Sequence, residues 1–211
     1  MELLQRISEE LQRGDDQAVG QSTRDAVAQG IDARSILDEG LIAGMAVVGE
    51  KFRRYEIFLP DVLLAARAMY AGMNVVKPLM AGGEVPTIGK AVIGTVQGDL
   101  HDIGKNLVGI MLKGAGFAVI DLGNDVAPET FVETAKAKGA PVIGMSALLT
   151  TTMPVMKKVV DLIREQGLAG EIRTIVGGAP LSDEFARKIG ADAYAFDGVS
   201  AVDRMKRLIG G

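Results

Sequence analysis

Short runs rich in β-branched residues alternate with amphipathic segments through the second part of the chain, and this alternation most constrains the fold. The runs are Ala91 to Val96, Phe117 to Asp121, Val142 to Met145, Ile172 to Val176 and Ala193 to Phe196. Helical patterns follow them, beginning near Ile103, Pro128, Thr152, Ser182 and Val199. Five such units in series predict a five-stranded parallel sheet with right-handed crossovers and helices on both faces. We expect a flavodoxin-like (Rossmann-like) strand order, because each half is too short for a dinucleotide-binding one.

The first part of the chain has helical periodicity instead. Its apolar residues recur at helical spacing in three groups: Leu3, Leu4, Ile7 and Leu11; Ile36, Leu37, Leu41 and Met45; and Val62, Leu63, Ala66 and Met69. Breaks at Gly14, Gly30 to Asp32 and Phe58 to Pro60 predict four helices, which would form a small bundle. The periodicity stops in the Gly- and Pro-containing segment Ala81 to Thr87. We therefore predict two domains, a helical bundle over residues 1–86 and an α/β domain over residues 87–211.

Composition and charge exclude several classes of protein. The net charge of −4 and the aromatic content of 4% argue against a nucleic-acid-binding surface. The sequence has no cysteine, which excludes disulfides, iron–sulfur clusters, thiolate zinc sites and cysteine nucleophiles. No basic segment and apolar run follow Met1, and prolines interrupt the longest uncharged stretch, Gly139 to Met156. We therefore expect a cytoplasmic protein without a secretion signal or a membrane span.

Polar loops follow three of the predicted strands, at the sheet edge where ligands bind in folds of this kind. The loop after the first strand, residues 97–106, contains His101, the single histidine of the chain. The loops after the third and fourth strands cover residues 146–152 and 177–180. Because the carboxyl ends of parallel strands share one edge, we expect these three loops to converge.

Several common interpretations of this edge fail. A P-loop needs a hydroxyl after its Gly-Lys pair, whereas Asn106 stands there, and the glycines lack the spacing of the dinucleotide fingerprint. A phosphoacceptor receiver domain would have Asp in place of Ser146, and no nucleophile elbow accompanies His101. One histidine with carboxylates leaves too few soft ligands for zinc. The remaining interpretation is a metal that is carried by its own macrocycle and needs one ligand from the protein.

Three separate motifs support this interpretation. They are Asp99-x-His101-x-x-Gly104, Ser146-x-Leu148 and Gly177-Gly178, separated by residues 105–145 and 149–176. In order and spacing they resemble the cobalamin-binding motif of methionine synthase and its relatives. Residues 48–52, 57–62 and 65–69 resemble the helical cap domain of the same family. The whole chain is similar to the stand-alone corrinoid proteins of the methanol, methylamine and methoxyaromatic methyltransferase systems.

The resemblance implies roles for individual residues. His101 would be the lower axial ligand of cobalt in cobalamin bound base-off, because a corrin supplies the equatorial nitrogens and neutral imidazole suits the axial position. Asp99 would accept the proton of the second ring nitrogen, and Thr152 would accept or relay a hydrogen bond from Asp99. An alternative for Thr152 is a plain helix N-cap. The slot for the cofactor tail and the rest of the binding loops would involve Gly98, Asp102, Ile103, Gly104, Ser146, Leu148, Thr150, Gly177 and Gly178.

In the helical part, Phe58, Leu59 and Val62 would shield the upper face of the corrin, although all three equally suit a bundle core. The function implied is to carry a methyl group on cobalt between a substrate-specific methyltransferase and a second methyltransferase, with a reductive activase as a possible further partner. The chain would not turn over alone. Alternatives are the small subunit of an adenosylcobalamin mutase, which rarely has such a cap, and a cobalamin-dependent sensor, for whose DNA-binding domain the acidic first part leaves no room. No partner among nucleic acids or membranes is expected.

Overall fold

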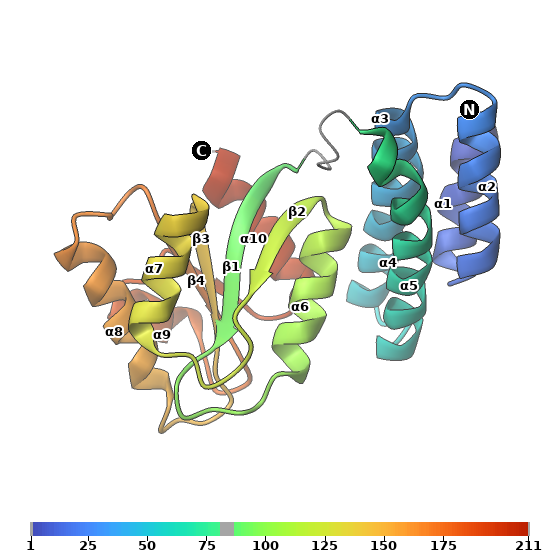
Figure 1. The fold of residues 1–211 in the computed structure, drawn as a ribbon. Helices are drawn as coiled ribbons and strands as arrows, with labels where there is room; N and C mark the ends of the chain where they lie inside the picture. Colours follow the sequence, from blue (N-terminus) through green and yellow to red (C-terminus); the bar gives the residue numbers. More distant parts are fainter. Residues whose placement is uncertain (1, 81–86, 211) are drawn as a thin grey trace. The chain divides into compact units, whose positions relative to one another are not determined.

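The computed structural model describes residues 2–80 and 87–210, and the chain divides into a helical unit that ends at Thr87 and an α/β unit that begins at Ile88 (Figure 1). Residues 81–86, most of the segment in which the sequence predicted the domain boundary, lie outside the described residues. None of the described helices is both long and apolar enough to cross a bilayer.

The helical unit contains four helical runs, as the sequence predicted. The described elements are α1 (Glu2–Gln12), α2 (Asp16–Ala28), α3 (Ala33–Ser35), the π-helix η1 (Ile36–Ile42), α4 (Ala43–Arg53), α5 (Leu59–Val76) and the 3₁₀ turn η2 (Lys77–Leu79). The segments α3, η1 and α4 follow one another without a break. Gly14 separates the first two helices with a φ of 72°, a left-handed conformation that favours glycine.

The core of the helical unit follows the predicted apolar stripes. Ile7 and Leu11 from α1 and Leu41 from η1 are fully buried. Leu63 is an exception, because 46% of it is exposed although it belongs to an apolar stripe. Helix α5 begins after Phe58, whose N–H donates to the Asp61 carboxylate at 2.8 Å. This is the capping arrangement expected where Pro60 stands in the first turn.

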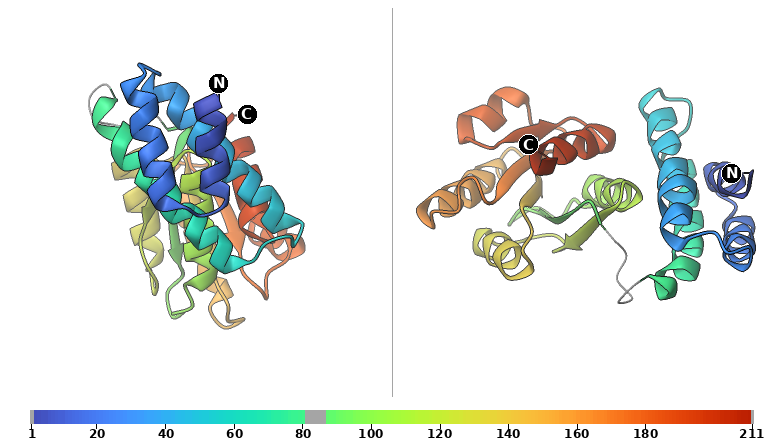
Figure 2. Two further views of the ribbon diagram at one scale, coloured as in Figure 1. Left: turned by 90° about the vertical axis from the view of Figure 1, so that its right-hand side faces the viewer. Right: turned by 90° about the horizontal axis from the view of Figure 1, so that it is seen from above.

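The α/β unit is a five-stranded parallel sheet with helices on both sides of it (Figure 2). The strand order β2-β1-β3-β4-β5 confirms the flavodoxin-like prediction. In chain order the elements are β1 (Gly89–Thr95), α6 (Ile103–Gly114), β2 (Phe117–Asp121), α7 (Pro128–Lys138), β3 (Val142–Ser146), α8 (Met153–Glu165), β4 (Arg173–Gly177), α9 (Asp183–Ile189), β5 (Ala193–Ala195) and α10 (Gly198–Gly210).

The sheet is buried, as a parallel sheet covered by helices must be. Val92, Ile143 and Val176, from three neighbouring strands, join one apolar cluster with fully buried Phe131 of α7. A Cβ added to Gly94 of β1 would lie 2.7 Å from the Phe131 ring, so this glycine gives the ring its space. The packed core fixes the strands, and their carboxyl ends bring the three polar loops to one edge.

Candidate corrinoid site

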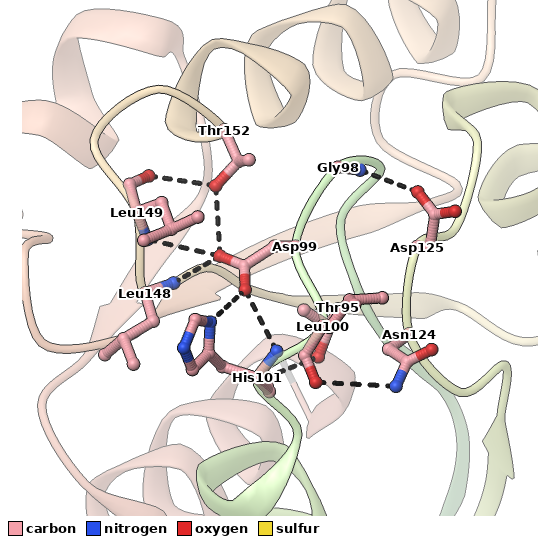
Figure 3. A network of polar contacts seen from close by, with 10 residues as sticks. All are labelled: Thr95, Gly98, Asp99, Leu100, His101, Asn124, Asp125, Leu148, Leu149 and Thr152. Atoms are coloured by element: carbon pink, nitrogen blue, oxygen red, sulfur yellow. Dashed lines mark hydrogen bonds and ion pairs between the residues drawn. The ribbon is translucent and has the colours of Figure 1, made fainter.

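Asp99 is the centre of the site at the carboxyl edge of the sheet (Figure 3). It follows β1 and has no exposed surface. Its Oδ1 accepts from the main-chain N–H of His101 at 3.0 Å and lies 2.7 Å from the ring Nδ1 of His101. Its Oδ2 accepts from the N–H of Leu148 at 2.7 Å and of Leu149 at 3.2 Å, and from the Thr152 hydroxyl at 3.0 Å. The carboxylate therefore ties the β1–α6 loop to the β3–α8 loop.

These hydrogen bonds determine the charge of Asp99. Burial alone would raise its pKa, but the N–H groups of His101, Leu148 and Leu149, together with the His101 ring, outweigh burial and hold the pKa of Asp99 well below its ordinary value. The carboxylate is thus ionised and can only accept hydrogen bonds. It follows that Thr152 donates, and the same hydroxyl also lies 2.9 Å from the Leu149 carbonyl oxygen. The expectation that Thr152 might accept from Asp99 was wrong for this reason.

Thr152 stands at the N-cap position of α8, but its side chain makes no capping hydrogen bond. Its hydroxyl is directed to Asp99 and to the Leu149 carbonyl oxygen instead. The alternative of a plain helix cap is therefore not what the geometry shows. Thr152 is buried, so it reaches Asp99 inside the protein, away from solvent.

His101 combines a fixed ring with an accessible nitrogen. Because Asp99 accepts, Nδ1 carries the proton, and in the neutral ring the lone pair is on Nε2. Nε2 has no hydrogen-bond partner among the described residues, and 52% of the side chain is exposed. The Thr95 hydroxyl, from the end of β1, donates to the His101 carbonyl oxygen at 3.0 Å. Within residues 2–80 and 87–210 no group of three or more His, Asp or Glu side chains could hold a metal ion. The chain thus offers one oriented imidazole nitrogen.

The predicted binding loops do converge. The N–H of Ala147 donates to the Gly177 carbonyl oxygen at 3.3 Å, and the N–H of Val96 donates to that of Ser146 at 3.0 Å. Gly178 has a φ of 135°, and a Cβ there would lie 1.9 Å from the Ala147 carbonyl oxygen. A side chain at Gly178 would therefore collide with the neighbouring loop, so Gly178→Val would disturb the fold as well as any ligand.

The remaining predicted residues differ in accessibility. Gly98, Ile103, Gly104, Leu148 and Thr150 are exposed at this edge, whereas Asp102, Ser146, Gly177 and Gly178 are partly buried. A Cβ at Gly104 would have no neighbour within 4 Å. In the helical unit, 66% of Phe58 is exposed, Leu59 is intermediate and Val62 is fully buried. The contact of Phe58 and Leu59 with a cofactor stays a prediction, whereas Val62 has no exposed surface and belongs to the core of the helical unit, the alternative that the sequence left open.

Sequence reasoning missed several residues of the site. Asp125 and Asn124 from the β2–α7 connection contact the His101 loop, through Gly98 N–H to the Asp125 carboxylate at 2.7 Å and Asn124 Nδ2 to the Leu100 carbonyl oxygen at 3.5 Å. The signal that could have found them is their position after the second strand, at the same edge. A set of exposed apolar side chains was also missed, namely Leu100, Leu149 and Phe196.

These features fit a corrinoid. A large flat macrocycle needs an apolar surface, and Leu100, Ile103 and Leu148 at this edge are exposed by 70%, 74% and 43%. Its metal needs one further nitrogen, which His101 offers. The bare glycine at position 104 leaves room beside the loop. The fold and the site together are those of the corrin-binding class of proteins.

Comparison with known proteins agrees with this class. Two family models, each described as a B12 binding domain, match residues 3–77 and 89–205. The chain is 41% identical over 210 residues to trimethylamine corrinoid protein 1 of Methanosarcina mazei, covering 99% of this chain and 97% of that protein. It is 44% identical over 211 residues to dimethylamine corrinoid protein 1 of the same organism, covering 100% and 97%. The chain belongs to the family of corrinoid proteins, and its cofactor is a cobalamin or a related corrinoid.

Solved structures show the same two-part fold. The methanol:cobalamin methyltransferase complex MtaBC from Methanosarcina barkeri matches with a TM-score of 0.91 and 31% identity, over 100% of this chain and 80% of that one. A cobalamin-binding protein from Desulfitobacterium hafniense matches with a TM-score of 0.81 and 29% identity, over 97% and 98%. The helical unit and the parallel sheet are thus both features of corrinoid proteins.

Proposed function

We propose that this protein carries a methyl group on the cobalt of a corrinoid bound base-off, with His101 as the lower axial ligand. The observation that carries the proposal is the pairing of His101 Nδ1 with the buried carboxylate of Asp99 at 2.7 Å, which leaves Nε2 free. A corrinoid supplies the metal to which a methyl group binds and from which it is transferred. The chain supplies binding, orientation and the basicity of the axial nitrogen.

Asp99 sets that basicity in this proposal. A carboxylate that accepts the Nδ1 proton makes the imidazole a stronger donor through Nε2 and prevents the ring from rotating. Thr152, Leu148 and Leu149 donate to the other carboxylate oxygen, so they withdraw part of its charge and fix its position. The strength of the axial ligand therefore depends on the β3–α8 loop as well as on the histidine.

The displaced nucleotide base and its tail would enter the slot between the loops after β1, β3 and β4. The residues that line it in this proposal are Gly104, Ser146, Leu148, Thr150, Gly177 and Gly178. Gly98, Asp102 and Ile103 would contact the cofactor elsewhere in the same loops. The close approach of Gly178 to Ala147 supports the idea that these loops are kept thin, because only glycine permits that backbone path. Phe58 and Leu59 would shield the opposite face of the corrin, whereas Val62, which is fully buried, would support them from the core of the helical unit.

The partners would be methyltransferases. A solved relative forms a methanol:cobalamin methyltransferase complex, and curated relatives are named for trimethylamine and dimethylamine. By this analogy a substrate-specific methyltransferase loads the methyl group, a second methyltransferase removes it, and a reductive activase restores the cofactor. The relatives match both units, which favours a methyl carrier over the mutase subunit as the function of the whole chain.

Electron paramagnetic resonance tests the axial ligand. Protein made with ¹⁵N-histidine and loaded with hydroxocobalamin, then reduced to the Co(II) state, should show coupling to one ¹⁵N nucleus. The coupling should disappear in His101→Ala and persist in Lys157→Ala, a truncation of an exposed side chain of α8. Coupling to the nitrogen of the cofactor's own base, or to none, in the unaltered protein would refute ligation by His101.

A further inference from the structure

The β2–α7 connection contains a strained residue beside the site. Asp125 has a φ of 53°, and only Tyr55 shares a positive φ among the described residues other than glycine. The left-handed conformation is unfavourable for residues with a Cβ, although Asp tolerates it better than most. Such conformations persist where the surrounding contacts hold them, and they gather at functional sites.

Asp125 holds the loop that precedes His101 at two points. Its carboxylate accepts from the Gly98 N–H at 2.7 Å, and its own N–H donates to the Asp99 carbonyl oxygen at 3.1 Å. Gly98 also has a left-handed backbone, with a φ of 84°. The two hydrogen bonds flank the Gly98–Asp99 peptide, so together they fix the direction in which the Asp99 side chain leaves the main chain.

Neighbouring contacts join the same connection to the end of β1. The N–H of Thr95 donates to the Gly123 carbonyl oxygen and the N–H of Val126 to that of Thr95, both at 3.0 Å. Figure 3 shows Asn124 and Asp125 on one side of the His101 loop, and Leu148, Leu149 and Thr152 on the other. The loop that contains His101 is thus held on one side by the β3–α8 loop and on the other by the β2–α7 connection. On the second side, the contact from a charged side chain is made by Asp125.

We propose that Asp125 is a positioning residue, which acts through the Gly98–Asp99 main chain to aim the Asp99 carboxylate at His101 Nδ1 and so determines the tautomer of the histidine. Asp125 does not touch the ring, and its carboxylate and its N–H reach only the main chain that precedes it. The consequence for ligand strength rests on the proposed function, whereas the effect on the ring belongs to the cofactor-free protein.

The single histidine makes this inference directly measurable. In ¹⁵N-labelled, cofactor-free protein without a histidine tag, the ring nitrogen shifts report one residue. The unaltered protein should show the Nδ1–H tautomer. Asp125→Gly removes the acceptor and relieves the backbone strain, so it should shift the ring toward a mixture of tautomers and speed hydrogen exchange of the Gly98 amide by about tenfold. Asp125→Asn keeps a weaker acceptor, so its tautomer population and its Gly98 exchange rate should lie between those of the unaltered protein and of Asp125→Gly.

Tyr55→Gly is the matched control, since it also introduces glycine at a non-glycine residue with a positive φ. It should change neither the tautomer of His101 nor the exchange rate of the Gly98 amide. If Asp125→Gly speeds Gly98 exchange but leaves the tautomer unchanged, the residue serves only the turn and the inference is overturned. If Asp125→Gly does not fold, an unchanged tautomer in Asp125→Asn together with faster Gly98 exchange overturns it equally. Failure of the Co(II) test would refute the proposed ligand and leave this result standing.

Discussion

Gly104 and Gly178 both belong to the proposed cofactor slot, yet the structure separates what substitutions at the two positions would do. A Cβ at Gly104 meets no atom within 4 Å, whereas a Cβ at Gly178 would lie 1.9 Å from the Ala147 carbonyl oxygen. Gly104→Leu should therefore weaken cofactor binding without unfolding the protein. Gly178→Ala should unfold the α/β unit more readily even without cofactor.

The magnitudes follow from the same contacts. At Gly178 an ordinary contact requires a shift of about 1.5 Å, and the φ of 135° adds backbone strain, so we expect a loss of about 3 kcal/mol from overpacking and strain together. For a protein of this size that loss lowers the midpoint of thermal unfolding by roughly 10 °C. Gly104 lies in the first turn of α6, where Ala is preferred to Gly by up to about 1 kcal/mol, so its variants should melt no lower than the parent.

Two assays separate an effect on cofactor binding from an effect on the stability of the fold. Circular dichroism of cofactor-free protein gives the unfolding midpoints, and titration with hydroxocobalamin followed by visible absorption gives the dissociation constants. Gly104→Leu should raise the dissociation constant at least about tenfold, equivalent to ~1.4 kcal/mol, and Gly104→Ala should raise it less. Unaltered binding by Gly104→Leu would show that the cofactor does not pass this position. An unaltered midpoint for Gly178→Ala would refute the argument from backbone geometry.

Three further predictions test the polar contacts of the α/β unit. Asp99→Asn should cost about 1–3 kcal/mol of unfolding free energy, since its NH₂ group must face donors from His101 or from Leu148 and Thr152 in either orientation, and urea denaturation of cofactor-free protein measures this. The folded pKa of Asp99 lies below the unfolded value of about 3.9. Its stabilisation is therefore fully present above pH 5 and is lost progressively as the pH falls from about 4 toward the folded pKa, so the difference in unfolding free energy between parent and Asp99→Asn should narrow from pH 7 to pH 3. A constant difference would contradict the lowered pKa. Lys105→Met should lower the unfolding free energy by ~1–2 kcal/mol, because the side chain of Lys105 is buried and its Nζ lies 2.6 Å from both carboxylate oxygens of the partly exposed Asp121. As a matched control, Lys157→Met on the surface of α8 should change the unfolding free energy by less than about 0.5 kcal/mol.

The fold was largely predictable because its signals are periodic. Runs such as Ala91 to Val96 are buried on both faces, so they stay apolar along their whole length, and the strand order follows from short right-handed crossovers. Leu63 shows where periodicity fails, since it has the spacing of a core residue but lies on the outer side of α5. Exposed apolar residues of a helix carry the same pattern as buried ones, and only the packed structure distinguishes them.

The side chains of the site were predictable from their spacing or from the family resemblance, as the contact of Thr152 with Asp99 shows, whereas the main-chain groups were not. Asp99 and His101 are two residues apart, so a sequence pattern can express their hydrogen bond. The N–H groups of Leu148 and Leu149 act through the main chain, which leaves no mark on residue identity, although they hold the same carboxylate. Asp125 is 26 residues from Asp99, and its role depends on a left-handed backbone conformation, which the presence of an Asp predicts only weakly. The electrostatic environment of the histidine therefore comes from three loops that the sheet places together. The sequence identified Asp99, His101 and Thr152 from two of them, and missed Asp125 from the third.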